Sequence, residues 1–159
     1  MALDSAQLMA DFASAATATG FERPPLRYEH LPAPHRPRGL PTGFGAVYVF
    51  TLAARWWPGA PGAGRVLKVG RVGPNSDARF CSQHYNPTSS SSNLANTLLT
   101  ARVLWPYLGI EGLDATTVGE WIKNNTERDH FFVPAGAAAI MPILETYVRG
   151  RLAPVFEGG

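Results

Sequence analysis

The sequence has little cysteine, little lysine and no long apolar run, and each shortage excludes a class of protein. Cys81 is the only cysteine among 159 residues, so a disulfide framework and a four-cysteine zinc site are impossible within one chain. No run approaches the roughly 18 apolar residues that a membrane-spanning helix needs. Residues 1–20 contain Asp4 and Asp11 but no basic residue, which is unlike a secretory signal. We therefore expect a cytoplasmic protein without a membrane span.

Charged residues are also scarce, and the cations among them are of one kind. They make up 16 % of the chain, against about 25 % in an average globular protein. Apolar residues make up 45 %, which is enough for a core and excludes overall disorder. Lys68 and Lys123 are the only lysines among 14 cations. An excess of arginine suits bidentate contacts to phosphate, but the codon usage of a GC-rich genome produces the same bias.

Proline marks the organisation of the chain. Six prolines fall within residues 24–42, namely Pro24, Pro25, Pro32, Pro34, Pro37 and Pro41. This density excludes a helix and a central strand and favours an extended connector. The preceding residues, 1–23, show the loosely amphipathic pattern of a helix. We expect an N-terminal helix (1–23), a proline-rich connector (24–42) and a folded domain (43–159).

Within residues 43–159, three runs rich in β-branched and aromatic residues predict strands, at 45–52, 66–70 and 129–133. The first two are expected to form a hairpin. Helical spacing of apolar residues predicts helices at 78–84, 93–105, 116–124 and 137–151. Cys81 is expected to be buried. The fold class is α/β of the α+β type, with a small mixed three-stranded sheet flanked by helices.

Several polar residues interrupt these apolar elements. Tyr48 and Lys68 lie inside the two hairpin strands, and Glu145 lies on the apolar face of the last helix. Arg79 and His84 follow the hairpin. Burying unpaired charges is costly, so this set suggests one shared polar site. Taken singly, each residue also fits a structural role, such as a core tyrosine, a lysine whose stem is buried at an edge strand, or a solvated helix face.

The order of these residues resembles the GIY-YIG nuclease family. Ala46-Val47-Tyr48 stands where that family has Gly-Ile-Tyr, and Lys68-Val69-Gly70 stands where it has Tyr-Ile-Gly. Arg79 matches the family's catalytic arginine, and Glu145 matches its metal-binding glutamate. The resemblance spans about residues 44–158. It rests on the order in which these motifs follow one another along the chain, because each tripeptide alone is weak evidence for the family.

The resemblance implies a DNA endonuclease that hydrolyses phosphodiester bonds with one divalent metal ion. Glu145 would hold Mg²⁺ or Mn²⁺, Arg79 would clamp the scissile phosphate, and Tyr48 or Lys68 would activate the attacking water. His84 or Tyr85 would form a hydrogen bond near the nucleophile. Further substrate contacts are expected from Arg71, Tyr85, Asn93 and Glu157.

Two departures from the family pattern leave alternatives open. The family's histidine or tyrosine four residues after the arginine is Gln83 here, and His84 is rotated about 100° further around an ideal helix. Either the helix is distorted there or the role passes to another residue. Glu157 replaces the final asparagine, as a second carboxylate or as a sign of an altered site. The chain is therefore expected to be a nuclease, a weak or inactive GIY-YIG-like binding module, or a small interaction domain. DNA is the expected partner, with a homodimer or a partner protein supplying specificity.

Overall fold

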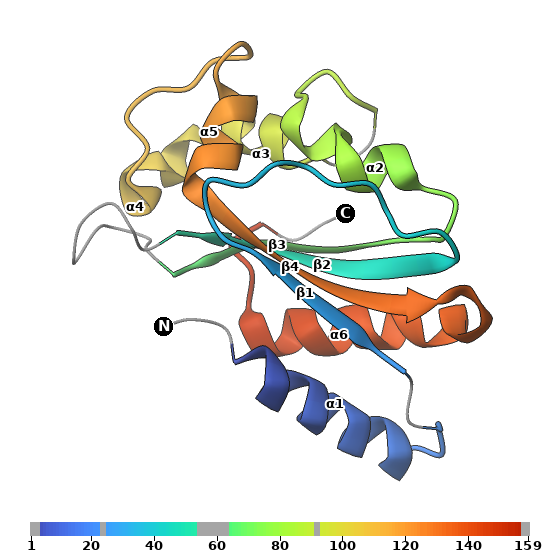
Figure 1. Cartoon of the computed structure of the whole chain (residues 1–159). Helices are drawn as coiled ribbons and strands as arrows, with labels where there is room; N and C mark the ends of the chain where they lie inside the picture. The colour runs from blue at the N-terminus through green and yellow to red at the C-terminus, as the bar shows by residue number, and fades with distance from the viewer. Residues whose placement is uncertain (1–3, 23–24, 54–63, 91–92, 157–159) are drawn as a thin grey trace.

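An antiparallel sheet between two helical layers forms the body of the molecule (Figure 1). The computed structural model describes residues 4–22, 25–53, 64–90 and 93–156. Helices α2 (Asp77–Cys81), α3 (Leu94–Thr100), α4 (Trp105–Leu108) and α5 (Val118–Asn125) lie on one side of the sheet. Helices α1 (Ser5–Ala18) and α6 (Met141–Leu152) lie on the other side. None of the helices in these ranges is long and apolar enough to cross a membrane.

The sheet has four strands in the order β1-β4-β2-β3. They are β1 (Arg27–Leu31), β4 (Thr126–Pro134), β2 (Phe44–Leu52) and β3 (Val66–Val72). The α+β class is confirmed, but the expected mixed sheet of three strands is wrong, because the sheet has four strands and every strand pair in it is antiparallel. The missing strand, β1, is a proline-free stretch between Pro25 and Pro32. It pairs with β4 at one edge of the sheet, where neighbouring prolines interrupt no ladder.

The helix α1 is joined to the sheet through α6. Asp4 caps its first turn, since the Asp4 carboxylate accepts a hydrogen bond from the Gln7 N–H at 2.9 Å. Leu8, Phe12 and Ala16 recur at every fourth position and are buried. They belong to a core cluster with residues of α6 and of the sheet face that α6 covers. The rings of Phe12 and Tyr147 lie 5.4 Å apart.

Two expected helices are interrupted on the other side of the sheet. The helix expected at 93–105 divides into α3, a 3₁₀ turn (Arg102–Leu104) and α4. The indole Nε1–H of Trp105 donates to the Leu98 carbonyl at 2.7 Å, and a continued helix would need that carbonyl. Pro106 lies in the first turn of α4 rather than ending a helix, because this turn requires no proline N–H.

The helix expected at 78–84 also ends early. Helix α2 stops at Cys81 and a 3₁₀ turn (Gln83–Tyr85) follows, where the Ser82 hydroxyl donates back to the Ala78 carbonyl at 3.0 Å. Cys81, the last residue of this helix, is half-buried rather than buried as expected. The last expected helix, at 137–151, is a 3₁₀ segment (Ala135–Ile140) followed by α6.

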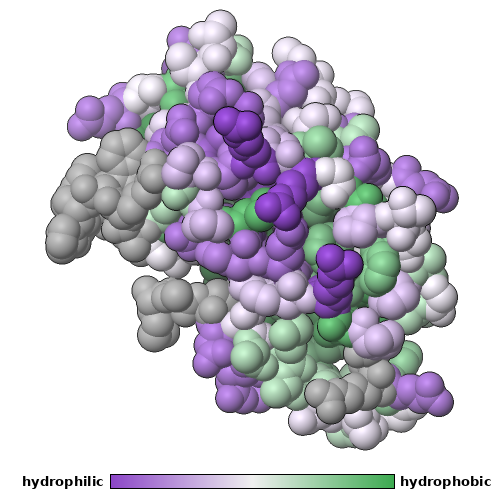
Figure 2. Space-filling view, viewed as in Figure 1, coloured by the Kyte–Doolittle hydropathy of each residue, from purple (hydrophilic) through white to green (hydrophobic). Residues whose placement is uncertain are grey.

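The side of the molecule that faces the viewer in Figure 1, where β1 lies, is polar at its centre. Figure 2 shows hydrophilic side chains gathered there, with hydrophobic ones between them. The opposite edge of the sheet is β3, and it carries the groups described below.

Replacing Phe12 by alanine tests whether α1 belongs to the core. Phe12 is 1 % exposed, so its loss leaves a cavity, and F12A should lower the free energy of unfolding by about 3–4 kcal/mol. Urea denaturation followed by circular dichroism measures the change. The matched control is Phe21→Ala, because Phe21 is 41 % exposed and its removal should change stability by only about 0.5 kcal/mol. Equal losses in the two variants would show that α1 does not contribute to the core.

Candidate active site

The outer edge of β3 is covered along only part of its length. The N–H groups of Val155 and Phe156 donate to the carbonyls of Val66 and Leu67, each at 2.9 Å. Beyond this point, from Val69 to Val72, no strand of the described chain pairs with the outer edge. An uncovered edge is usually protected by charged side chains, and here such side chains surround a pocket.

This edge pocket has a volume of about 320 Å³. Four separate elements, β2, β3, α2 and α6, line it with polar groups from both faces of the sheet. Its lining residues are Tyr48, Lys68, Val69, Gly70, Arg71, Arg79, Glu145 and Arg149. The pocket therefore contains four side chains of the basic type and one carboxylate.

Gly70 allows Tyr48 to reach the edge pocket. Tyr48 lies on β2, one strand inside the edge, and its register partner on β3 is Gly70. A Cβ atom on Gly70 would lie 2.6 Å from Cζ of the Tyr48 ring, so only glycine leaves room for the ring to cross β3. The glycine of the Lys-Val-Gly tripeptide thus brings a phenol from a central strand to the edge.

The hydroxyl of Tyr48 is held by His84. Nε2 of His84 lies 2.6 Å from the Tyr48 oxygen, while Nδ1 accepts a hydrogen bond from the Leu94 N–H at 3.3 Å. A neutral imidazole whose Nδ1 accepts must carry its proton on Nε2. His84 therefore donates to the Tyr48 oxygen, and Arg79 also forms a side-chain hydrogen bond with Tyr48.

The early end of α2 places His84 beside the Tyr48 hydroxyl. An unbroken helix would rotate His84 away from the position four residues after Arg79, but α2 ends at Cys81 and the 3₁₀ turn resets the direction of the chain. Of the two alternatives left open by the sequence, the distorted helix is therefore the one found. Tyr85, the neighbour of His84, does not line the edge pocket; its hydroxyl contacts His35 and Arg128.

Burial shifts the pKa values of two pocket residues in opposite directions. Burial raises the pKa of Tyr48 above its usual 10, although the positive charge of Arg79 and its hydrogen bond act to lower it. Burial lowers the pKa of Lys68, and the positive charges of Arg79 and Arg149 lower it further. Losing a proton is thus harder for Tyr48 and easier for Lys68 than in water.

Both oxygens of Glu145 face arginines. Nε of Arg71 lies 2.9 Å from Oε2, and Nη2 of Arg149 lies 2.9 Å from Oε1. Arg149 follows Glu145 by one helical turn on α6, and its Nη2 is also 3.5 Å from the Val69 carbonyl. Sequence reasoning missed Arg149, although its position four residues after Glu145 is a recognisable signal.

The predicted site residues are only partly brought together. Tyr48, Lys68, Arg71, Arg79 and Glu145 line the edge pocket, and His84 lies directly behind Tyr48. Asn93 does not line it. It is buried as the N-cap of α3, where its side chain accepts from the Asn96 N–H at 2.7 Å. Glu157 lies outside the described residues.

A buried cation lies behind the edge pocket. Arg128 on β4 is fully buried, and it donates to the Tyr85 hydroxyl at 2.9 Å and to the Phe80 carbonyl at 3.1 Å. Its guanidinium carbon also lies 4.7 Å from the centroid of the Phe50 ring, a cation–π distance. Arg128 thereby joins β4 to α2 and to the turn that carries His84.

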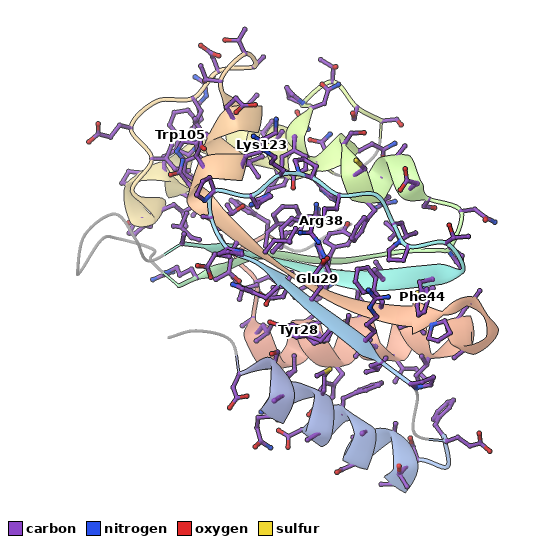
Figure 3. The ribbon with its side chains drawn as sticks, in the orientation of Figure 1. Tyr28, Glu29, Arg38, Phe44, Trp105 and Lys123 are labelled. Carbon is purple, nitrogen blue, oxygen red and sulfur yellow. The ribbon has the colours of Figure 1, made fainter. Side chains whose placement is uncertain are left out.

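Three buried histidines surround this cation, and none is charged at neutral pH. Burial, with the positive charge of Arg128 among the other causes, lowers the pKa of His35 to about 4 and of His130 to about 2. The same two causes lower the pKa of His84 well below its usual value. Nδ1 of His130 lies 2.9 Å from Glu29, which accepts a hydrogen bond from Arg38 at 2.6 Å; Figure 3 shows Glu29 and Arg38 side by side at β1.

The edge pocket offers a divalent ion one carboxylate, that of Glu145. No group of three or more metal-ligating side chains occurs among the described residues, so a site built wholly from protein ligands is not found there. Mg²⁺, however, is commonly bound by one or two carboxylates, with water and substrate phosphate completing its shell. Glu145 supplies one such carboxylate, and the neighbouring cations can hold the phosphate.

A larger pocket lies elsewhere, between the start of α1, residues 64–66 and the end of α6, with a volume of about 460 Å³. Arg65, Arg151 and Asp4 line it together with apolar residues. The nearest ion pair, Arg151 with Asp11 at 3.2 Å, joins α6 to α1. This pocket has a carboxylate and two arginines but no lysine, tyrosine or histidine among its described lining residues, so the edge pocket is the candidate site.

No family model, curated protein or solved structure matches this chain. The resemblance to GIY-YIG nucleases therefore stays a prediction, and the functional argument depends on the geometry of the edge pocket.

The buried neutral histidines should make the protein less stable in acid. In the unfolded chain each histidine takes up a proton near pH 6.5, whereas in the folded chain it does so only at a lower pH. Stability is therefore complete above pH 6.5 and is lost as the pH falls below it, by about 2 kcal/mol at pH 5 for each of His35 and His130. Urea unfolding measured at pH 7 and at pH 5 gives the loss.

The matched variant for this measurement is His130→Phe. His130 packs against the Phe80 and Phe132 rings, with centroids 4.7 and 5.6 Å away, so a phenyl ring suits the space. The variant should lose about 2 kcal/mol less than the wild type between pH 7 and pH 5. The same loss in both proteins would contradict this assignment.

Proposed function

We propose that the chain is a metal-dependent DNA endonuclease that hydrolyses phosphodiester bonds in the edge pocket. One observation carries the proposal. Tyr48, Lys68, Arg79 and Glu145 come from β2, β3, α2 and α6, yet they line one pocket. An interaction domain has no need for this convergence, because the four residues could then occupy unrelated positions.

The charges of the edge pocket suit a phosphodiester. Lys68, Arg71, Arg79 and Arg149 are basic residues opposed to one carboxylate, Glu145. The Nε of Arg79 is buried and has no hydrogen-bond partner among the described residues, so the hydrogen-bonding capacity of this guanidinium is not used up by the protein. A guanidinium fork binds two phosphate oxygens at once. Arg79 would therefore clamp the scissile phosphate and stabilise the negative charge that grows on it.

Lys68 and Tyr48 would activate the attacking water. The direction of the two pKa shifts makes Lys68 the better proton acceptor and keeps Tyr48 a neutral phenol. The Tyr48 oxygen accepts from His84, so its own O–H can orient the water or a phosphate oxygen. With Lys68 in its neutral amine form, the water oxygen attacks phosphorus and the water proton passes to the amine. The bond to the leaving oxygen breaks, and that oxygen takes the bonding electrons and then a proton from solvent.

Glu145 would hold the divalent cation, Mg²⁺ or Mn²⁺, beside the scissile phosphate. When bound, such an ion supplies stabilisation of the charge on the leaving oxygen. Glu145 is positioned for this by α6, whose apolar residues Leu144 and Val148 are buried against the sheet. A single pocket cleaves a single strand, so a double-strand cut requires a second copy or a partner protein.

A binding module without catalysis is the second candidate, and a specific observation favours it. Both Glu145 oxygens contact arginines, an arrangement that competes with a metal ion for the carboxylate. In this alternative the edge pocket binds nucleic-acid phosphates and leaves them intact.

Cleavage of supercoiled plasmid DNA separates the two candidates. The purified wild-type protein should nick or linearise the plasmid with Mg²⁺ or Mn²⁺ and lose this activity in EDTA. Glu145→Gln and Arg79→Lys should each lower the rate about 100-fold or more, since each removes stabilisation of the transition state. Gel electrophoresis over time gives the rates.

Arg151→Gln is the matched control for these variants. Arg151 is an exposed arginine on α6 that pairs with Asp11 and does not line the edge pocket, so R151Q should cleave at the wild-type rate. Cleavage that survives in E145Q and R79K would exclude the edge pocket as the nuclease site. DNA binding without cleavage under every metal condition would favour the binding module.

A further inference from the structure

We propose that Arg71 is a displaceable partner of Glu145 and makes metal binding depend on substrate phosphate. In the free protein Arg71 occupies one oxygen of the carboxylate, and a DNA phosphate draws Arg71 away so that the oxygen becomes available to the metal ion. This inference rests on the proposed function, because it assigns Glu145 to the metal.

The two arginines at Glu145 are held to different degrees. Arg149 is 33 % exposed, lies on the same helix as Glu145, and also reaches the Val69 carbonyl. Arg71 is 46 % exposed and lies on the uncovered part of β3. Its ion pair with Glu145 uses Nε, one of the five N–H donors of a guanidinium. Arg71 is therefore the partner that can leave.

A phosphate can compete successfully for Arg71. An ion pair with one exposed member is weak in water, and Arg71 meets Glu145 through Nε, whereas a phosphodiester can offer the guanidinium two parallel hydrogen bonds. The position of Arg71 also suits the exchange. It follows Gly70 directly and lines the edge pocket with Arg79, so the phosphate that Arg79 clamps would lie within the same 320 Å³ space.

Movement of Arg71 affects the metal ion in two ways. It frees Oε2 of Glu145, and it takes a positive charge away from the place where a divalent cation would bind. DNA should then strengthen metal binding, and by thermodynamic reciprocity the metal ion should strengthen DNA binding by the same factor. Arg71 is thus a positioning residue that couples the two ligands.

The test is a Mn²⁺ titration of the full chain, followed by electron paramagnetic resonance of the free ion in the absence of DNA. The Arg71→Gln variant should bind Mn²⁺ about five- to tenfold more tightly than the wild type, since it lacks both the competing ion pair and the repelling charge. Arg151→Gln removes an arginine of similar exposure, 51 %, and should bind Mn²⁺ within about twofold of the wild type. Equal affinities in R71Q and R151Q would overturn the proposal.

A second titration adds a short duplex with phosphorothioate linkages, which resist hydrolysis. The duplex should tighten Mn²⁺ binding in the wild type and in R151Q, and its effect should be several-fold smaller in R71Q, whose carboxylate oxygen is already free. The same tightening in all three proteins would exclude Arg71 as the coupling residue.

Glu145→Gln separates this inference from the proposed function. If Mn²⁺ binding is lost in E145Q but R71Q binds Mn²⁺ with the same affinity as R151Q, Glu145 holds the metal. In that case only the proposed role of Arg71 fails. If E145Q binds Mn²⁺ as the wild type does, the metal assignment of Glu145 fails, and the proposed mechanism fails with it.

Discussion

The close contact between Tyr48 and Gly70 is the constraint on which the edge pocket depends. Tyr48 lies on β2, which is paired on both sides, and its ring is fully buried in a core cluster. The missing side chain at position 70 lets the ring extend across β3. The phenol then reaches the edge, where Lys68, Arg79 and Glu145 also arrive. Any larger residue at position 70 would separate Tyr48 from these groups.

The helical side of the sheet holds this arrangement from behind. Arg128 donates to the Phe80 carbonyl and to the Tyr85 hydroxyl, and these residues are the chain neighbours of Arg79 and His84. A buried arginine is costly to desolvate, and here surrounding aromatic rings offset part of that cost. Arg128 thus fixes the spacing between the residue that would clamp the phosphate and the residue that orients Tyr48.

Much of the fold follows from local sequence patterns, and the exceptions have physical reasons. The apolar run at β2 predicts a strand, and eight of the nine residues of that strand are buried. Strand β1 is hidden among prolines, and its edge position makes their presence harmless. The helix expected at 93–105 breaks at Ala101, where the Trp105 indole takes the Leu98 carbonyl that a further helical turn would use. Such competition for a backbone carbonyl is not visible in hydrophobic periodicity.

Local sequence patterns likewise predict part of the candidate site, whereas the rest depends on contacts between residues far apart in the chain. The order of Tyr48, Lys68, Arg79 and Glu145 along the chain suggests a shared site, and they do line one pocket. The role of His84 was uncertain, because its contact with Tyr48 depends on where α2 ends. Asn93, an expected substrate contact, lies outside the edge pocket, and its side chain caps the start of its own helix. Pairing of Glu145 with Arg71 connects α6 to β3, a contact that no local pattern encodes.

The central proposal is that Glu145 in the edge pocket holds the divalent ion. Paramagnetic broadening by Mn²⁺ in amide nuclear magnetic resonance spectra tests it most directly, because broadening identifies the nearest amides. The account predicts that the amides of Val69, Gly70 and Glu145 broaden first, while that of Gly112, which does not line the pocket, stays sharp. Broadening that begins at another carboxylate, such as Asp114 or Glu120, and spares Gly70 would contradict the account.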